Sequence, residues 1–226
     1  MTNKTPTFNS LKDSYKHKGM RKLLINEVKS KGIKDERILE IMLKIPRHFF
    51  FERIFEIHAY EDKAFPIGEG QTISQPYTVA FQTELLSVAS GSKILEIGTG
   101  SGYQASVLLE LGVDLYTIEY NRILFERTSR FLPKMGYNPH FFHGDGSKGL
   151  VEHAPYDGII VTAGAPSVPN TLVNQLKIGG RLIIPVGDGK SQSMIKIVRT
   201  SQNKISKKTY ENFSFVPLLG EKGWNQ

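Results

Sequence analysis

The chain has 226 residues, enough to bury the core of one enzyme-sized domain. Hydrophobic residues make up 39% and charged residues 23%, a balance typical of globular proteins and unlike that of disordered, collagen-like or membrane-spanning chains. The net charge of +7 favours acidic partners, whereas the complete lack of cysteine excludes disulfides, thiolate metal sites and cysteine nucleophiles.

Residues 11–58 have the pattern of a helical lead-in. Four apolar residues between Ile38 and Ile45 recur at i, i+3, i+4 and i+7, which places them on one helix face, and Pro46 then interrupts the run. We interpret the following run, Arg47-His-Phe-Phe-Phe51, as core and not as a platform for stacking bases.

Residues 59–76, which read AYEDKAFPIGEGQTISQP, are rich in turn-forming residues and show no regular periodicity. This pattern predicts a long loop that lies over another part of the molecule and does not form a core element. Because long ordered loops usually serve a function, we expect this covering loop to contribute to a site.

From residue 77 to about residue 200, apolar strands alternate with amphipathic helices. The predicted strands are Lys93–Ile97, Asp114–Glu119, His140–His143, Gly158–Val161 and Arg181–Val186, and the predicted helices are Thr78–Ala89, Tyr103–Leu111, Arg122–Leu132 and Asn170–Leu176. This order predicts a doubly wound, mostly parallel α/β sheet with right-handed crossovers. Two further strands, around Lys204–Tyr210 and Asn212–Pro217, are expected to be antiparallel and to lie at or near the sheet edge.

A glycine-rich turn, Gly98–Gly102, follows the first predicted strand of this alternating region. A short apolar strand that leads into glycines and then into a helix lets a cofactor approach bare backbone at a helix N-terminus. The spacing is G-x-G-x-G, and Tyr103 stands where the dinucleotide fingerprint has its third glycine. NAD and FAD are therefore disfavoured.

Two other strand ends carry carboxylates that suit an adenosine. Glu119, about twenty residues beyond Gly98, can accept hydrogen bonds from a ribose diol. Asp145, in the turn His143-Gly-Asp-Gly146, could accept a hydrogen bond from an adenine amino group. The sequence has no P-loop, the motif that binds the polyphosphate of a nucleotide. An adenosine-containing ligand without a polyphosphate indicates S-adenosyl-L-methionine. The alternative is a tight strand-to-helix turn without a ligand, with Glu119 as a solvated strand end.

Eight runs along the chain form a wider pattern. They are Ile45-Pro-Arg-His-Phe49, Ala59-Tyr-Glu-Asp62, Pro66-Ile-Gly-Glu-Gly-Gln-Thr-Ile-Ser-Gln-Pro76, Leu95-Glu-Ile-Gly-Thr-Gly-Ser-Gly-Tyr-Gln104, Gly144-Asp-Gly146, Ala154-Pro-Tyr-Asp157, Gly179-Gly-Arg-Leu-Ile-Ile-Pro-Val-Gly187 and Phe215-Val-Pro-Leu218. Together they closely resemble the protein-L-isoaspartate O-methyltransferase family, from about Gly32 to Trp224. The resemblance implies a monomeric, Rossmann-like class I methyltransferase that uses S-adenosyl-L-methionine to methylate the free α-carboxylate of L-isoaspartyl residues in damaged proteins.

The resemblance also implies which residues form the site. Ser74 matches the active-site serine of the family. The implied cofactor contacts are Gln71, Thr72, Ile73, Ser74, Gly98, Thr99, Gly100, Ser101, Gly102, Glu119, Asp145 and Gly146. Some relatives have histidine where this chain has Tyr77, so the role of Tyr77 stays open.

The proposed chemistry also follows from the substrate itself. An isoaspartyl linkage leaves a free α-carboxylate with a pKa of about 3.3–3.7, which is ionised at neutral pH and needs no general base. The enzyme then has to align this carboxylate with the methyl group and exclude water, and a serine hydroxyl suffices to orient it. The alternative role for Ser74 is the N-cap of the helix that begins near Tyr77.

The rival functions are a nucleic-acid or small-molecule methyltransferase and a non-catalytic protein that binds S-adenosyl-L-methionine. The basic residues between Lys12 and Lys34 could contact phosphate, but we interpret them as the solvated face of the N-terminal helices. The turn after the fourth strand, Val161-Thr-Ala-Gly-Ala-Pro, lacks the Asn/Asp-Pro-Pro-aromatic sequence usual in enzymes that methylate base amines. The intact Gly70–Pro76 segment argues against loss of catalysis.

The remaining expectations concern organisation and partners. We expect one methyltransferase domain over residues 1–226, with the lead-in at 11–58, the covering loop at 59–76, the cofactor-binding core at 77–200 and C-terminal strands at 201–226 that close the substrate site. His140 and His143 would point to opposite faces of a strand, so no metal is expected. We expect isoaspartyl proteins as partners, no nucleic acid or membrane, and, since the start lacks a signal peptide, a cytoplasmic location.

Overall fold

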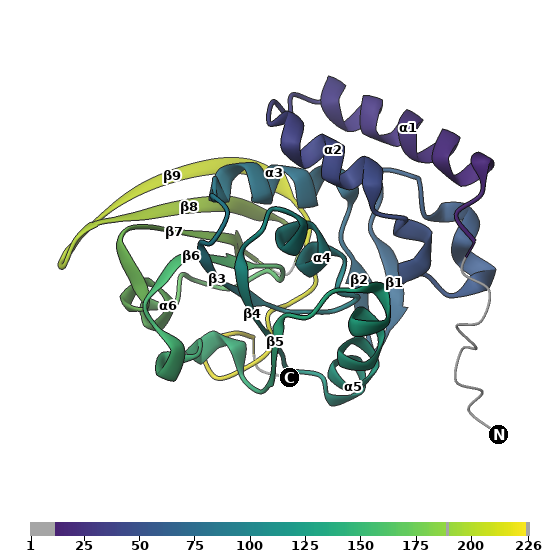
Figure 1. Cartoon of the computed structure of the whole chain (residues 1–226). Coiled ribbons are helices and arrows are strands. Elements are labelled where there is room, and N and C mark those ends of the chain that lie inside the picture. Colours follow the sequence, from purple (N-terminus) through teal and green to yellow (C-terminus); the bar gives the residue numbers. More distant parts are fainter. Residues whose placement is uncertain (1–11, 189, 225–226) are drawn as a thin grey trace.

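The computed structural model describes residues 12–188 and 190–224 (Figure 1). The helical lead-in is confirmed from Tyr15 onward, whereas its predicted start at residue 11 lies outside the described residues. It consists of helices α1 (Tyr15–Ser30) and α2 (Glu36–Lys44) and two 3-10 turns, η1 (Arg47–Phe50) and η2 (Arg53–His58). Apolar residues of both helices face the core, since Leu24, Val28, Ile38 and Met42 are buried.

A seven-stranded sheet in the order β5-β4-β3-β6-β7-β8-β9 forms the centre of the molecule. Its strands are β3 (Lys93–Ile97), β4 (Asp114–Glu119), β5 (His140–His143), β6 (Tyr156–Val161), β7 (Leu176–Gly187), β8 (Gln192–Ser201) and β9 (Lys204–Phe213). The strands from β5 to β7 pair in parallel, and β8 and β9 add antiparallel pairs at one edge. The order reverses between β3 and β6, which is where α/β sheets usually bind their ligands.

Neighbouring residues of a strand point to opposite faces of the sheet, so apolar side chains lie on both faces. Helices cover both of them. Ile94 of β3 belongs to one buried cluster, together with residues of α1 to α5, whereas Leu95 belongs to a second cluster that includes Leu172 of α6. The core helices are α3 (Pro76–Leu86), α4 (Tyr103–Glu110), α5 (Arg122–Phe131) and α6 (Asn170–Asn174). In Figure 1, α1 and α2 form an outer layer over α3 and α4.

The covering segment differs from the prediction of a loop without strands. It contains a two-stranded antiparallel hairpin, β1 (Phe65–Gly68) and β2 (Gln71–Ile73). The chain reverses at Glu69, which has a φ of 54°, with glycines of positive φ on either side of it. Strands of three and four residues are too short to show an alternating pattern in the sequence, so the hairpin was not predicted. One of its residues, Ile73, is nevertheless buried and only 1% exposed.

Other boundaries were also wrong. The strand β8 was not predicted, and the strand expected at Asn212–Pro217 does not exist as a separate element, because β9 continues to Phe213. The helix expected from Thr78 begins two residues earlier, at Pro76, a residue suited to a first helical turn. None of the helices in the described ranges is long and apolar enough to span a membrane.

Candidate active site

A cavity lies at the carboxyl ends of β3, β4 and β6, where the strand order reverses. Its empty volume is about 770 Å³, open solvent included. It is lined by Gln71, Thr72, Ile73, Ser74, Val79, Ile97, Gly98, Thr99, Gly100, Ser101, Tyr103, Gln104, Ile118, Glu119, Tyr120, Asn121, Gly146, Thr162, Ala163, Val216, Pro217, Leu218 and Leu219. The hairpin, the sheet and the C-terminal segment therefore surround one space.

The glycine-rich turn has a backbone that only small residues tolerate. Gly98 has a φ of 94°, and a Cβ on it would lie 2.5 Å from Oγ1 of Thr162. Gly102 has a φ of 84°, and its Cβ would lie 2.8 Å from a methyl group of Leu132. Packing therefore requires glycine at these two positions, and Gly98 and Gly100 line the cavity.

Glu119 joins this turn to the end of β4. One carboxylate oxygen accepts a hydrogen bond from the backbone N–H of Gly100 at 2.8 Å, and the other accepts one from Asn121 at 2.8 Å. The residue is 6% exposed and lines the cavity, so the alternative of a solvated strand end is wrong. The predicted contacts from Gln71 to Ser74, the Gly98–Ser101 turn, Glu119 and Gly146 are all brought together here.

Asp145 and Gly102 are the predicted contacts that do not line the cavity. Oδ1 of Asp145 accepts hydrogen bonds from the backbone N–H and the hydroxyl of Ser147, and Oδ2 accepts one from the backbone N–H of Glu221. Its carboxylate therefore stabilises a turn and attaches the C-terminal segment. Gly146 faces the cavity in its place.

A second cavity meets the first at the end of the hairpin. It is lined by Lys31, Ala64, Thr72, Ser74, Gln75, Tyr77, Thr78, Lys190, Ser191, Phe213, Ser214 and Phe215. Thr72 and Ser74 line both cavities. Aromatic rings pack along one side of this second cavity. The Tyr77 ring stacks on Phe81 with 5.8 Å between ring centroids, and Phe81 stacks on Phe213 with 5.3 Å between them.

Ser74 lies between β2 and α3, and its hydroxyl has no hydrogen-bond partner in the described part of the chain. The alternative that Ser74 is the N-cap of α3 is wrong. Gln75 occupies the N-cap position without a capping side-chain bond, and Asp62 accepts the hydrogen bond of the Tyr77 N–H at 2.7 Å. The Ser74 hydroxyl is therefore available to a ligand.

Several lining residues were missed by the sequence interpretation. Tyr120 and Asn121 directly follow β4, and Thr162 and Ala163 follow β6, so the rule that ligands bind at the carboxyl ends of parallel strands pointed to them. The C-terminal region 201–226 was expected to close the substrate site, and Val216–Leu219 of this region line the first cavity, although they follow β9 and do not belong to it.

Glu96, on β3 behind the glycine-rich turn, is fully buried. Burial raises the pKa of its carboxyl to about 8, with a smaller contribution from the nearby Glu119 carboxylate, against the Thr117 hydrogen bond, which lowers it. One oxygen accepts a hydrogen bond from the Thr117 hydroxyl at 2.6 Å, and the other has no partner among the described residues. The carboxyl is therefore mainly protonated at neutral pH.

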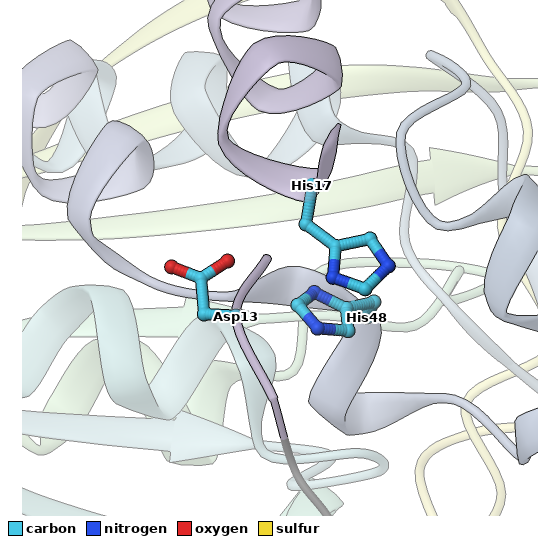
Figure 2. A group of neighbouring side chains, drawn as sticks. All are labelled: Asp13, His17 and His48. Carbon is cyan, nitrogen blue, oxygen red and sulfur yellow. The ribbon is translucent and has the colours of Figure 1, made fainter. Parts of the chain in front are cut away.

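A cluster of Asp13, His17 and His48 lies outside the cavities (Figure 2). The imidazole rings are 3.9 Å apart between centroids, with Asp13 beside them. Both Asp13 oxygens already accept hydrogen bonds from Arg21, at 3.1 and 2.9 Å, and a Tyr60 hydroxyl lies 2.6 Å from Nδ1 of His48. Since a guanidinium next to the carboxylate would repel a cation, the arrangement suits a structural network better than a metal site.

The N-terminal basic residues and the aromatic run fit the sequence interpretation with one exception. Arg47, His48 and Phe50 are buried, which confirms that this run is core. Most lysines of α1 are exposed, but Arg21 is only 5% exposed and is bound to Asp13, so it does not belong to a solvated face.

Comparison with known proteins finds relatives over almost the whole chain. The family described as protein-L-isoaspartate(D-aspartate) O-methyltransferase matches residues 19–223. A protein-L-isoaspartate O-methyltransferase of Cytophaga hutchinsonii is 55% identical over 215 residues, which cover 95% of this chain and 97% of that protein. The protein of the same name from Christiangramia forsetii is 55% identical over 213 residues, 94% of this chain and 100% of that protein.

Two solved structures have the same fold. A protein-L-isoaspartate O-methyltransferase superposes with a TM-score of 0.77 at 30% identity, over 89% of this chain and 66% of that chain. A beta-aspartate methyltransferase from Plasmodium falciparum, in complex with S-adenosyl-L-homocysteine, superposes with a TM-score of 0.74 at 25% identity, over 88% of this chain and 98% of that chain. The predicted fold class, a Rossmann-like methyltransferase with a helical extension, is confirmed.

Proposed function

The chain belongs to the protein-L-isoaspartate(D-aspartate) O-methyltransferase family of S-adenosyl-L-methionine-dependent enzymes, and from this membership we propose how its own residues act. The reaction transfers a methyl group to the free α-carboxylate of an L-isoaspartyl residue in a damaged protein. We assign the cofactor to the cavity beside the glycine-rich turn and the isoaspartyl peptide to the adjoining cavity. Ser74 stands at their junction.

The first cavity has the chemical groups that S-adenosyl-L-methionine needs. The Glu119 carboxylate suits the ribose diol, and the N-terminus of α4 beyond Ser101 suits the methionyl carboxylate. Gln104 donates to Thr83, and its Oε1 is buried without a partner among the described residues, which suits the methionyl ammonium. The exposed Tyr120 ring offers a surface for the adenine. When bound, the cofactor supplies an electrophilic methyl group on a sulfonium.

The chain's own residues position and desolvate the acceptor. The isoaspartyl carboxylate is already ionised, so no side chain has to remove a proton. The Ser74 hydroxyl donates a hydrogen bond to this carboxylate and orients one oxygen toward the methyl group. A carbon–oxygen bond forms as the sulfur–methyl bond breaks, leaving a methyl ester and S-adenosyl-L-homocysteine. The backbone nitrogen that follows then displaces methanol to give a succinimide, and its hydrolysis returns part of the residue as normal aspartate.

One observation carries this assignment: Ser74 lines both cavities and has an uncommitted hydroxyl. A group that aligns two reactants has to reach both of them. We further propose that the chain acts as one domain, since its hairpin, sheet and C-terminal segment line adjoining cavities, and as a monomer, as the family resemblance implies. The lack of cysteine supports a cytoplasmic location.

The function is tested by incubating the protein with methyl-labelled S-adenosyl-L-methionine and three acceptors. These are an isoaspartyl peptide, the same peptide with normal aspartate, and RNA. We expect base-labile label in the isoaspartyl peptide only, because only an ester loses its methyl group as methanol in base. Label in RNA, or in none of the three, would overturn the assignment.

Glu119→Gln is expected to weaken binding of S-adenosyl-L-homocysteine about 10- to 100-fold, because an amide cannot accept from both Gly100 and Asn121 and offers the ribose no charge. Isothermal titration calorimetry measures the effect. Glu110→Gln is the matched control, since Glu110 binds Lys44 and Tyr137 and does not line the cavity. Equal affinity of the Glu119 variant and wild type would remove Glu119 from the cofactor site.

A further inference from the structure

Arg47 is a buried cation next to the active site. It is 1% exposed, and its guanidinium lies 4.6 Å from the centre of the Tyr103 ring. Its Nε donates to the backbone carbonyl of Ala59 at 3.0 Å, and its Nη2 donates to the backbone carbonyl of Ser74 at 2.9 Å. The two carbonyls lie at opposite ends of the segment that contains the covering hairpin, so one side chain fixes both ends.

Arg47 keeps its charge in a buried position. Burial lowers the pKa of Arg47 to about 10, so the guanidinium is still charged at neutral pH. Its Nη1 is buried without a hydrogen-bond partner of good geometry among the described residues, although the nearby Tyr103 hydroxyl raises the pKa of Arg47 somewhat. A buried charge with an unpaired donor costs free energy, and apolar residues of similar volume often replace such groups without loss of stability. The contact with Ser74 offers a functional reason to keep it.

Asp62 holds the other side of the same segment. Its side chain is 2% exposed and forms a salt bridge with Lys31. One carboxylate oxygen accepts a hydrogen bond from the Gln75 side chain at 3.0 Å, and the other accepts one from the Tyr77 N–H at 2.7 Å. The residues on both sides of the Ser74–Gln75 peptide bond are therefore bound by buried charged groups.

We propose that Arg47 and Asp62 form a buried clamp that positions Ser74 for methyl transfer. The inference rests on the proposed role of Ser74. Since no protein group holds the Ser74 hydroxyl within the described ranges, the position of this hydroxyl depends on its backbone. A displacement of about 1 Å at a positioning group can cost about 100-fold in rate, so a clamp on the backbone has a direct effect on turnover.

The test is a double-mutant cycle with Arg47→Met and Ser74→Ala, measured as kcat on an isoaspartyl peptide at saturating S-adenosyl-L-methionine. We expect Arg47→Met to lower kcat about 10- to 100-fold in the wild-type background and less than about threefold in the Ser74→Ala background. Equal losses in both backgrounds would overturn the inference, because Arg47 would then not act through Ser74. No turnover by the wild type would instead refute the proposed function.

Arg21→Met is the control for a general loss of stability, because it removes another buried guanidinium. Arg21 contacts Leu43, Asp13 and Tyr60, and it does not line either cavity. We expect this control to lower the melting temperature with kcat within about threefold of wild type. A kcat loss equal to that of Arg47→Met would overturn the inference.

Two further variants keep the test decisive where Arg47→Met does not fold. Arg47→Lys retains the charge but not the two-carbonyl geometry, so we expect kcat between those of wild type and Ser74→Ala. Asp62→Ala removes the other half of the clamp and is expected to lower kcat about 10-fold, with the affinity for S-adenosyl-L-homocysteine within about threefold of wild type. Wild-type kcat in both variants would overturn the proposal.

Discussion

Ser74→Ala is expected to lower kcat on an isoaspartyl peptide about 100-fold, a loss of the size that a misplacement of about 1 Å in an aligned reactant causes. The affinity for S-adenosyl-L-homocysteine should stay within about threefold of wild type, because the carboxylate and backbone groups proposed to bind the cofactor lie at the sheet end. The loss should appear in kcat, since the hydroxyl acts by aligning the acceptor. Steady-state kinetics and calorimetry measure the two quantities separately.

Ser129→Ala is the matched control for this experiment. Its hydroxyl contacts the Glu126 carbonyl at 3.5 Å on α5 and does not line either cavity, so both kcat and cofactor affinity should match wild type. Wild-type turnover by Ser74→Ala would show that Ser74 has no part in the reaction. A parallel loss of cofactor affinity would show that it acts by binding the cofactor.

The cofactor side of the site could be predicted from the sequence because its signals are local. The turn from Gly98 to Gly102 needs positive φ angles within five residues of a strand, and Glu119 ends the next strand. The strands β3, β4 and β5 have the predicted bounds. Each of these features is determined by neighbours in the sequence.

The parts that were not predicted depend on contacts between distant residues. In β8 the neighbours Met194 and Ile195 are both buried, so the strand faces core on both sides and shows no alternation. Arg47 reaches Ser74 across 27 positions, and no pattern within one element reveals such a contact. The family resemblance placed Ser74 at the substrate, but the buried groups that hold its backbone are visible only in three dimensions.

Glu96→Gln is expected to make the protein more stable than wild type at alkaline pH. The pKa of the buried Glu96 carboxyl is about 8, against 4.5 for the same group in an unfolded chain. Between these values the folded state holds a proton that the unfolded state has released, so the free energy of unfolding falls as pH rises through this window. Glutamine has no proton to lose and removes this dependence.

The expected size of this effect comes from the same linkage. From pH 5.5 to pH 8 the Glu96 carboxyl should cost the wild type about 3 kcal/mol relative to the glutamine variant, at about 1.4 kcal/mol per pH unit. Urea unfolding of both proteins at the two pH values measures it, and the comparison cancels the titration of all other groups. The Thr117 hydroxyl can still donate to the amide oxygen of the glutamine, so the fold should be retained. A difference in the free energy of unfolding between the two proteins that does not change with pH would show that Glu96 is ionised in the folded protein. Glu96 and the neighbouring Glu119 would then both be charged behind the glycine-rich turn.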